Sequence, residues 1–250
     1  MQWTEQAIIL SARKFGESSL LIEVFAKSKG LYSGLVRGGQ SKTKLNIYQP
    51  GNIVEATWSS RLEEQLGTFA AELTDAVSSK VIHDSQKLLS LISVTSILRK
   101  TLIDRQPYND LYEHFQDFLN NLCQSNAGAR EWACEYVWME VAILRYLGFG
   151  LDLNACAVTG KTDNLQYISP RTGRAVTAEG AKGYEERLFT LPKFMLDGKL
   201  EDNNEITIAL EITEYFMAKE LFSPHERKLP TERDRFVKSL SRLNKFSDAM

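Results

Sequence analysis

The fold of this chain is decided by the stretch Gly30-Leu31-Tyr32-Ser33-Gly34-Leu35-Val36-Arg37-Gly38-Gly39-Gln40-Ser41-Lys42-Thr43-Lys44. Its first half predicts a strand over 31–36, because alternate residues of an extended chain face opposite sides. Two glycines then open a loop with no apolar side chain before Leu45, and this loop carries Arg37, Lys42 and Lys44. Glycine allows the close approach of a partner, and three cations attract a polyanion. The stretch therefore predicts a strand that runs into a mobile cationic loop, which suits a phosphate-backbone binder as well as a plain solvated hairpin.

Residues 1–75, on both sides of this stretch, predict five short strands at 7–12, 20–26, 31–36, 53–58 and 66–73. Turn residues separate them at roughly ten-residue intervals, a pattern typical of a small barrel or sandwich. A five-stranded OB-type barrel fits this length best. Such barrels commonly bind single strands through a basic groove and aromatic stacking platforms. Tyr32, Tyr48 and Trp58 are the candidate platforms, although a core position is more typical for Trp58.

The hydrophobic period changes from 2 to 3.6 near residue 79, which indicates helices. Apolar stripes predict helices near 88–102, 108–122, 132–147 and 206–221, and a short basic helix over 233–243. Strands at 165–169 and 174–177 flank the turn Pro170-Arg171-Thr172-Gly173 and predict a hairpin. The chain is thus predicted to be an α+β multidomain protein. Its domains are an N-terminal five-stranded OB-type β-barrel over 1–78 and a helical domain over 79–250, with a hairpin insertion at about 151–190.

The composition is that of an ordinary globular protein of 250 residues, with 43% hydrophobic and 25% charged residues. No run of about 18 apolar residues predicts a membrane span. The three cysteines are widely spaced and odd in number, which favours a reducing compartment and a cytoplasmic location. The net charge of −2 combines +4 over residues 1–50, −9 over 51–223 and +3 over 224–250. Basic ends around an acidic middle indicate a local electrostatic footprint for nucleic acid.

Sequence patterns for catalysis are missing, so the chain is not expected to be an enzyme, and no cofactor is expected. The histidines lie in no HExxH pattern, and no GxSxG pattern offers a nucleophilic serine. The tripeptide Gly160-Lys161-Thr162 resembles the end of a P-loop. However, Ala155 stands at the position of the first glycine, and no helix is predicted to follow.

Several segments along the chain form an ordered set. In the barrel region they are Ala7-Ile8-Ile9-Leu10, the turn Phe15-Gly16-Glu17-Ser18-Ser19, the strand 31–36 and the loop Arg37-Gly38-Gly39. In the centre they are Leu147-Gly148-Phe149-Gly150-Leu151-Asp152-Leu153-Asn154-Ala155-Cys156, then Tyr167-Ile168-Ser169-Pro170-Arg171-Thr172-Gly173-Arg174-Ala175-Val176, then Leu191-Pro192. In this order, over most of residues 1–195, they resemble the RecO family of bacterial recombination mediators.

The resemblance implies an OB barrel, a helical domain and a zinc-ribbon-like hairpin between helices. It also implies a non-enzymatic protein that binds single- and double-stranded DNA and anneals complementary strands. With RecR, such a protein helps RecA to load onto DNA coated by the single-strand-binding protein, SSB, in recombinational repair. Many members of the family also contact the acidic C-terminal tail of SSB. A location at the nucleoid of the bacterial cytoplasm follows from the same resemblance.

The hairpin departs from the family pattern at the zinc site. Members with zinc use two CxxC pairs, whereas this chain reads Cys156-Ala157-Val158-Thr159 in the first arm and Ala175-Val176-Thr177-Ala178 in the second. Three of the four thiolate ligands are missing, so no zinc or other metal is expected. We expect the turn and the packing of Leu165, Tyr167 and Val176 to hold the hairpin.

The candidate DNA-binding residues are cations of the barrel region, which are expected to neutralise phosphates. They are Arg37, Lys42, Lys44, Lys27 and Lys29, with Arg13 and Lys14 as secondary candidates. Further candidates near the C-terminus are Arg227, Lys228, Arg233 and Arg235. A salt bridge on an amphipathic helix suits Arg235 at least as well.

The alternative function is a protein-interaction adaptor that binds SSB or RecR without touching DNA, and the acidic middle of the chain favours it. An acidic SSB tail needs a basic pocket with apolar walls. The cations available for such a pocket on the helical domain are Arg99, Lys100, Arg105 and Arg130. A nuclease would need a carboxylate cluster that binds a metal ion, and no such activity is expected.

Overall fold

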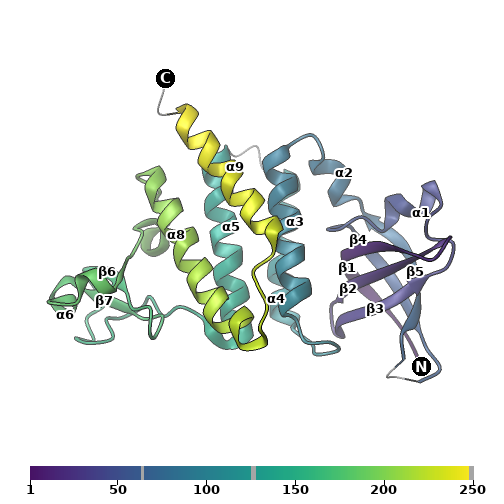
Figure 1. Ribbon diagram of the computed structural model, residues 1–250, viewed down its shortest axis with the longest axis horizontal. Helices are drawn as coiled ribbons and strands as arrows, with labels where there is room; N and C mark the ends of the chain where they lie inside the picture. The colour runs from purple at the N-terminus through teal and green to yellow at the C-terminus, as the bar shows by residue number, and fades with distance from the viewer. Residues whose placement is uncertain (63–64, 125–127, 248–250) are drawn as a thin grey trace. The chain divides into compact units, whose positions relative to one another are not determined.

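The computed structural model describes residues 1–62, 65–124 and 128–247. It divides into two compact units, one of Met1–Asn126 with Pro230–Ser239 and the other of Ala127–Leu229 with Leu240–Met250. The predicted fold class is confirmed, because a five-stranded barrel precedes helices that carry an inserted hairpin (Figure 1). The zinc-ribbon likeness of that hairpin stays a prediction.

The barrel is closed in the strand order β1-β2-β3-β5-β4, which is the order of an OB-type barrel. Its strands are β1 Gln2–Phe15, β2 Ser19–Ala26, β3 Gly30–Val36, β4 Ile53–Ser59 and β5 Gly67–Asp75. All five predicted strands are therefore present. The first is longer than the predicted 7–12, because its polar ends still pair with neighbouring strands.

β1 pairs with two different strands along its length. Its first half pairs with β4, from Gln2 opposite Ser59, and its second half pairs with β2 as far as the β1–β2 turn. A register shift between Ile9 and Ser11 marks a β-bulge. A bulge bends a strand and increases its twist, so a single strand can complete both sides of the barrel.

The barrel closes through a pair of glycines where β3 and β5 run in parallel. Gly34 lies opposite Gly67. A Cβ atom on Gly67 would lie 2.2 Å from Nε1 of Trp58, and one on Gly34 would lie 2.6 Å from the ring of Phe69. Both rings are buried in the barrel core. A side chain at either glycine would therefore collide with a ring that fills the barrel.

Aromatic rings fill the centre of the barrel core. Trp3 stacks on Trp58 at a centroid distance of 6.2 Å and meets the edge of Tyr32 at 5.1 Å. Tyr32, Tyr48 and Trp58 are 7%, 3% and 1% exposed. The prediction of stacking platforms at these three residues is therefore wrong, because a small core buries its large aromatic side chains first. The core position expected for Trp58 is confirmed.

The segment after β3 is more ordered than the mobile loop that we predicted. A turn over 37–40 leads into the short helix α1, Lys42–Ile47. Leu45 and Ile47 pack against the barrel core and thereby fix this helix. Lys42 and Lys44 consequently lie on a helix.

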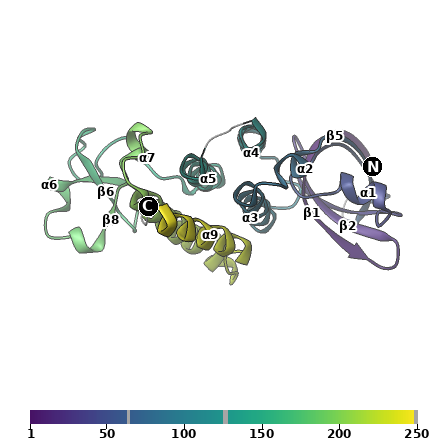
Figure 2. The same ribbon diagram turned by 90° about the horizontal axis from the view of Figure 1, so that it is seen from above.

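Besides α1, the same compact unit as the barrel contains the helices α2 Val77–Val81, α3 Ser85–Thr101 and α4 Asn109–Gln124 (Figure 2). α3 packs so closely on Gly51 that a Cβ atom there would lie 2.6 Å from a leucine methyl group. The α3–α4 linker adds to the edge of β3, where the Arg105 N–H donates to the Leu31 carbonyl at 2.9 Å. On α4, the Tyr112 hydroxyl donates to Gln6 Oε1 at 3.2 Å. These contacts fasten the helices to the barrel.

The second unit consists of helices and a small sheet. Its helices are α5 Ala129–Leu144, α6 Ala178–Ala181, α7 Phe194–Asp197 and α8 Asn203–Phe216. The sheet has the order β7-β6-β8, with β6 Leu165–Ile168, β7 Ala175–Thr177 and β8 Phe189–Thr190. π-helical turns extend α5 over Arg145–Phe149 and α8 over Met217–Phe222. The last helix, α9 Thr231–Ser247, contributes its first residues to the barrel unit and its remaining ones to this unit.

Cys156 joins the two arms of the hairpin. Its side chain is buried, and its sulfur accepts hydrogen bonds from the backbone N–H groups of Val158, Thr159 and Thr177 at 3.4, 3.3 and 3.3 Å. Burial raises the pKa of the thiol, but the hydrogen bonds from Thr159 and Thr177 outweigh it and lower the pKa to about 6. One sulfur thus collects donors from both arms, which holds them together.

We expect Gly67→Ala to lower the free energy of unfolding by about 2 kcal/mol or more, because the added methyl group overlaps the Trp58 indole. Trp58→Phe removes the indole edge, so Gly67→Ala costs less in that background. Denaturant unfolding of the wild type, both single variants and the double variant measures the coupling. Equal costs in the two backgrounds would show that the residues do not collide.

The Cys156 thiol predicts a pH-dependent stability. A pKa lowered to about 6 by folding means that the stabilisation is fully present above the unfolded pKa, near 9, and is lost as the pH falls through 6. The free energy of unfolding of the wild type should therefore rise between pH 6 and pH 9 relative to that of Cys156→Ala. Cys134→Ala is the control, because burial raises the pKa of Cys134 to about 11 and keeps this thiol protonated. A constant difference between wild type and Cys156→Ala across this range would contradict the assignment.

Candidate nucleic-acid interface

Two turns meet at one end of the barrel. The Gln40 side chain donates from Nε2 to the carbonyl of Gly16 at 3.0 Å and to that of Ser19 at 2.9 Å. Its backbone N–H donates to the Ser18 carbonyl at 3.0 Å. The β1–β2 turn is thereby tied to the turn that follows β3.

Five of the predicted DNA-binding cations lie at this end and are exposed: Arg13, Lys14, Arg37, Lys42 and Lys44. Arg13 and Lys14 lie near the end of β1, Arg37 follows β3, and the two other lysines lie on α1. Lys44 Nζ donates to the Arg37 carbonyl at 2.9 Å, which ties α1 to the turn. Cations gathered in this way create a positive potential that attracts phosphate groups.

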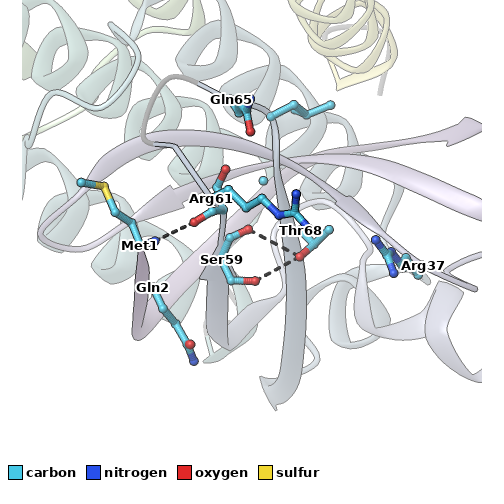
Figure 3. Close-up of a pocket in the computed structure, with 10 residues that line it drawn as sticks. Met1, Gln2, Arg37, Ser59, Arg61, Gln65 and Thr68 are labelled. Carbon is cyan, nitrogen blue, oxygen red and sulfur yellow. Dashed lines mark hydrogen bonds between the residues drawn. The ribbon is translucent and has the colours of Figure 1, made fainter.

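A groove of about 560 Å³ opens beside Arg37 (Figure 3). Arg37 comes from the end of β3 and Arg61 from the loop after β4. Figure 3 shows the Arg61 side chain reaching toward Thr68, in the direction of Arg37. The other polar residues that line the groove are Gln2, Ser59, Ser60 and Gln65.

Charge and hydrogen-bonding groups in this groove suit a sugar-phosphate backbone. Guanidinium groups bind phosphate oxygens in pairs, and hydroxyl and amide groups add neutral donors. None of the described residues that line the groove is a carboxylate. Glu63 and Glu64, in the same loop, lie outside the described residues. The groove and the adjoining cations form what we call the barrel-end site: Arg13, Lys14, Arg37, Lys42, Lys44 and Arg61.

Two residues at this end were not predicted, Arg61 and Phe15. OB-type barrels bind oligonucleotides through the β1–β2 and β4–β5 loops, and Arg61 lies in the second of these loops, so the topology contained the signal. Phe15 ends β1 and is 50% exposed, which leaves its ring open for a base to stack on. Its place at the start of the predicted turn Phe15-Gly16-Glu17-Ser18-Ser19 was the signal in the sequence.

The predicted contacts Lys27 and Lys29 lie elsewhere. They occupy the β2–β3 turn, at the opposite end of that hairpin from Arg37, and the seven-residue strand β3 places them about 20 Å away. Lys27 Nζ also pairs with Glu113 Oε1 of α4 at 3.3 Å. The structure therefore does not bring these two lysines to the barrel-end site.

Three of the four cations predicted for an acidic partner belong to the barrel unit: Arg99, Lys100 and Arg105. Arg99, the neighbour of Lys100 in the sequence, pairs through Nη1 with Glu23 Oε2 at 3.2 Å. The Arg105 guanidinium lies over the rings of Tyr32 and Trp58, at 5.3 and 5.8 Å from their centroids. Arg99 and Arg105 thus serve contacts within the barrel unit.

Arg130 belongs to the second unit and lines a groove of about 490 Å³. Four carboxylate residues line the same groove: Glu131, Glu135, Glu201 and Asp202. These carboxylates oppose the binding of an acidic tail there.

The C-terminal cations differ in burial. Arg233 is 0% exposed, so the prediction that it extends a surface track for DNA is wrong. Arg233 lies at the start of an amphipathic helix, and its sequence position alone does not predict that it is buried. Lys228 and Arg235 are exposed, and their contact with DNA stays a prediction.

Within residues 1–62, 65–124 and 128–247, no three or more His, Cys, Asp or Glu side chains are grouped so that they could hold a metal ion. Among the helices of those ranges, none is long and apolar enough to cross a membrane.

Comparison with known proteins agrees with this architecture. Residues 1–77 match the family model "Recombination protein O N terminal", and residues 82–229 match "Recombination protein O C terminal". A DNA repair protein RecO from Hyphomonas neptunium is 39% identical over 244 residues, which are 96% of this chain and 99% of the relative. A DNA repair protein RecO from Ruegeria is 40% identical over 243 residues, 97% and 99% of the two chains. The ordered segments of the barrel and hairpin thus predicted the family correctly, and the chain belongs to the RecO family of DNA repair proteins.

Proposed function

We propose that this protein is a non-enzymatic mediator of DNA repair and homologous recombination whose barrel-end site binds the backbone of single- and double-stranded DNA. The observation that carries the proposal is the groove beside Arg37 and Arg61, with neutral donors around two guanidinium groups. The family membership supports the role in repair. Its site of action is the nucleoid of the bacterial cytoplasm.

Electrostatics explains why the site suits DNA although the chain carries a net charge of −2. Counterions leave the phosphates when cations replace them, and this release drives binding. The effect depends on local charge, because interactions between exposed charges farther apart than about 8 Å are largely screened at physiological salt. Binding at the barrel end therefore depends on the charges close to the groove and not on the net charge of the whole chain.

Annealing needs no catalytic group. Two complementary strands repel each other through their phosphates, and a shared cationic surface screens that repulsion. Base pairing then proceeds between strands that are held close together. In this proposal the protein acts by binding alone, and with RecR it helps RecA to load onto SSB-coated DNA.

The SSB tail and RecR are proposed as protein partners. The acidic tail requires cations beside apolar walls, and Arg99, Lys100, Arg105 and Arg130 stay the predicted candidates. An adaptor that holds only SSB or RecR is the second candidate function, because residues 51–223 carry a charge of −9.

The double variant Arg37→Ala/Arg61→Ala tests the barrel-end site. We expect weaker binding of labelled single-stranded DNA and a slope of log K against log salt that is smaller by about 1.4, since each lost phosphate contact removes about 0.7. Fluorescence anisotropy across a salt series measures both. Charge reversal at Lys42 and Lys44 should act in the same direction.

The matched control is Lys27→Ala/Lys29→Ala, which removes two charges from the opposite end of the β2–β3 hairpin. Its slope should stay close to that of the wild type. Unchanged slopes in both double variants would remove the site assignment. Binding of an SSB-tail peptide by a wild-type protein that binds no DNA would establish the adaptor instead.

Phe15→Ala separates stacking from charge. Stacking of a base on an aromatic ring contributes about 1–3 kcal/mol, so the variant should bind single-stranded DNA about tenfold more weakly. Its salt slope should not change, because no phosphate contact is lost. Duplex DNA offers no unstacked base and should bind Phe15→Ala as it binds the wild type. An equal loss for both forms of DNA would contradict a stacking role.

A further inference from the structure

A second pocket lies in the second unit, beside the hairpin, and the proposed function leaves it unused. It has a volume of about 830 Å³, inside the roughly 300–1,000 Å³ range of ligand sites. The β6–β7 turn, the segment before β8 and the end of α8 supply its walls. We call it the hairpin pocket and define it by Val158, Arg171, Val176, Tyr184, Arg187, Tyr215 and Lys219.

The charge around this pocket is positive. Arg171, Arg187 and Lys219 line it, and none of the described lining residues is a carboxylate. Lys219 is partly engaged, because its Nζ pairs with Glu220 and donates to the Pro170 and Arg171 carbonyls at 3.3 Å each. For the side chains of Arg171 and Arg187, the described part of the chain shows no carboxylate partner. An anion is therefore the complementary ligand.

Two aromatic rings are open at the same pocket. Tyr184 is 60% exposed and Tyr215 is 39% exposed. Tyr215 is held in place by edge contacts with Phe189 at 5.2 Å and Phe216 at 5.3 Å. Aromatic side chains that line a concave site together with a few polar groups are typical of ligand pockets. Bases stack on such rings irrespective of sequence.

We propose that the hairpin pocket is a second contact for single-stranded nucleic acid, with bases against Tyr184 and Tyr215 and phosphates at Arg171 and Arg187. The inference rests on the proposed DNA binding of this chain and adds a site to it. Two contacts on one chain raise the effective concentration of a bound strand at each of them. Strand capture is then stronger than either contact alone would give.

Nucleic acid fits this pocket better than an acidic peptide. Arginine clusters also recognise acidic peptides, so the two exposed rings carry the choice: bases stack on open aromatic faces while the neighbouring cations pair with phosphates. Here the walls include two open tyrosine rings beside separate cations, so bases and phosphates each meet a complementary group. Glu185 and Glu186 precede Arg187 but do not line the pocket, and Glu185 accepts a hydrogen bond from the Gly183 N–H at 2.9 Å.

Photo-crosslinking of the full-length protein tests the contact directly. The probe is an oligothymidylate that carries 5-iodo-deoxyuridine, which forms adducts with aromatic side chains in contact with it. Peptide mapping by mass spectrometry should find adducts on Tyr184 or Tyr215 in addition to adducts at the barrel end. Adducts on barrel peptides alone would overturn the inference and leave the proposed function intact. If adducts form on the hairpin alone, and Arg37→Ala/Arg61→Ala binds DNA with the affinity and salt slope of the wild type, the barrel-end site is overturned instead.

Binding measurements on variants give a second readout. Tyr184→Ala should bind the oligonucleotide about tenfold more weakly with an unchanged salt slope. Arg171→Ala/Arg187→Ala should reduce the slope by about 1.4. The matched control Lys182→Ala/Lys199→Ala removes two exposed charges of the same unit that do not line the pocket, and it should leave the slope unchanged.

Three outcomes decide against the pocket. An equal reduction of the slope in the two double variants would show a general charge effect. An unchanged slope in Arg171→Ala/Arg187→Ala would show that these arginines contact no phosphate. An acidic peptide whose binding requires Arg171 and Arg187, while DNA binding does not, would assign the pocket to a protein tail. Thermal unfolding controls for damage to the fold, and the high exposure of Tyr184 makes its removal harmless to the core.

Discussion

The contact between Gly34 and Gly67 decides the shape of the first unit. Only two residues without side chains let β3 and β5 approach while Trp58 and Phe69 fill the barrel behind them. The closed barrel fixes where β3 ends and where the β4–β5 loop begins. It thereby places Arg37 and Arg61 at one groove. The chemistry of the barrel-end site thus depends on two residues that have no functional group.

A second tie acts across the same end of the barrel. The amide of Gln40 bonds to two carbonyls of the β1–β2 turn, so the cations that follow β3 lie beside those that end β1. One of these hydrogen bonds is exposed and the other is partly buried, and each contributes modestly to stability. Their main effect is positional, because they let flexible lysine and arginine side chains share one patch of surface.

Strands and helices, which depend on local periodicity, were predictable from the sequence. Burial inside the barrel and the lining of the groove, which depend on closure of the barrel, were not. The hydrophobic period of 2 predicted the strands and the period of 3.6 predicted the helices. The ordered segments predicted the family. Alternation alone does not say which face of a closed barrel points inward, so Tyr32 was misassigned to the surface. Tyr48 follows α1, outside any strand, so no alternation could reveal its burial. Arg61 was missed because its neighbours in the groove come from other strands, and the burial of Arg233 depends on tertiary packing. Cations at turns, such as Arg37, were predictable because a turn leaves them exposed.

The composite lining of the groove has a thermodynamic consequence. Its residues come from β1, β4, β5 and the end of β3, so the groove exists only while the barrel is closed. Any opening of β5 away from β3 dismantles it. By mass action, a ligand that occupies the groove stabilises the closed barrel over every opened form. The melting temperature of the barrel unit is therefore also a gauge of how much nucleic acid the protein carries.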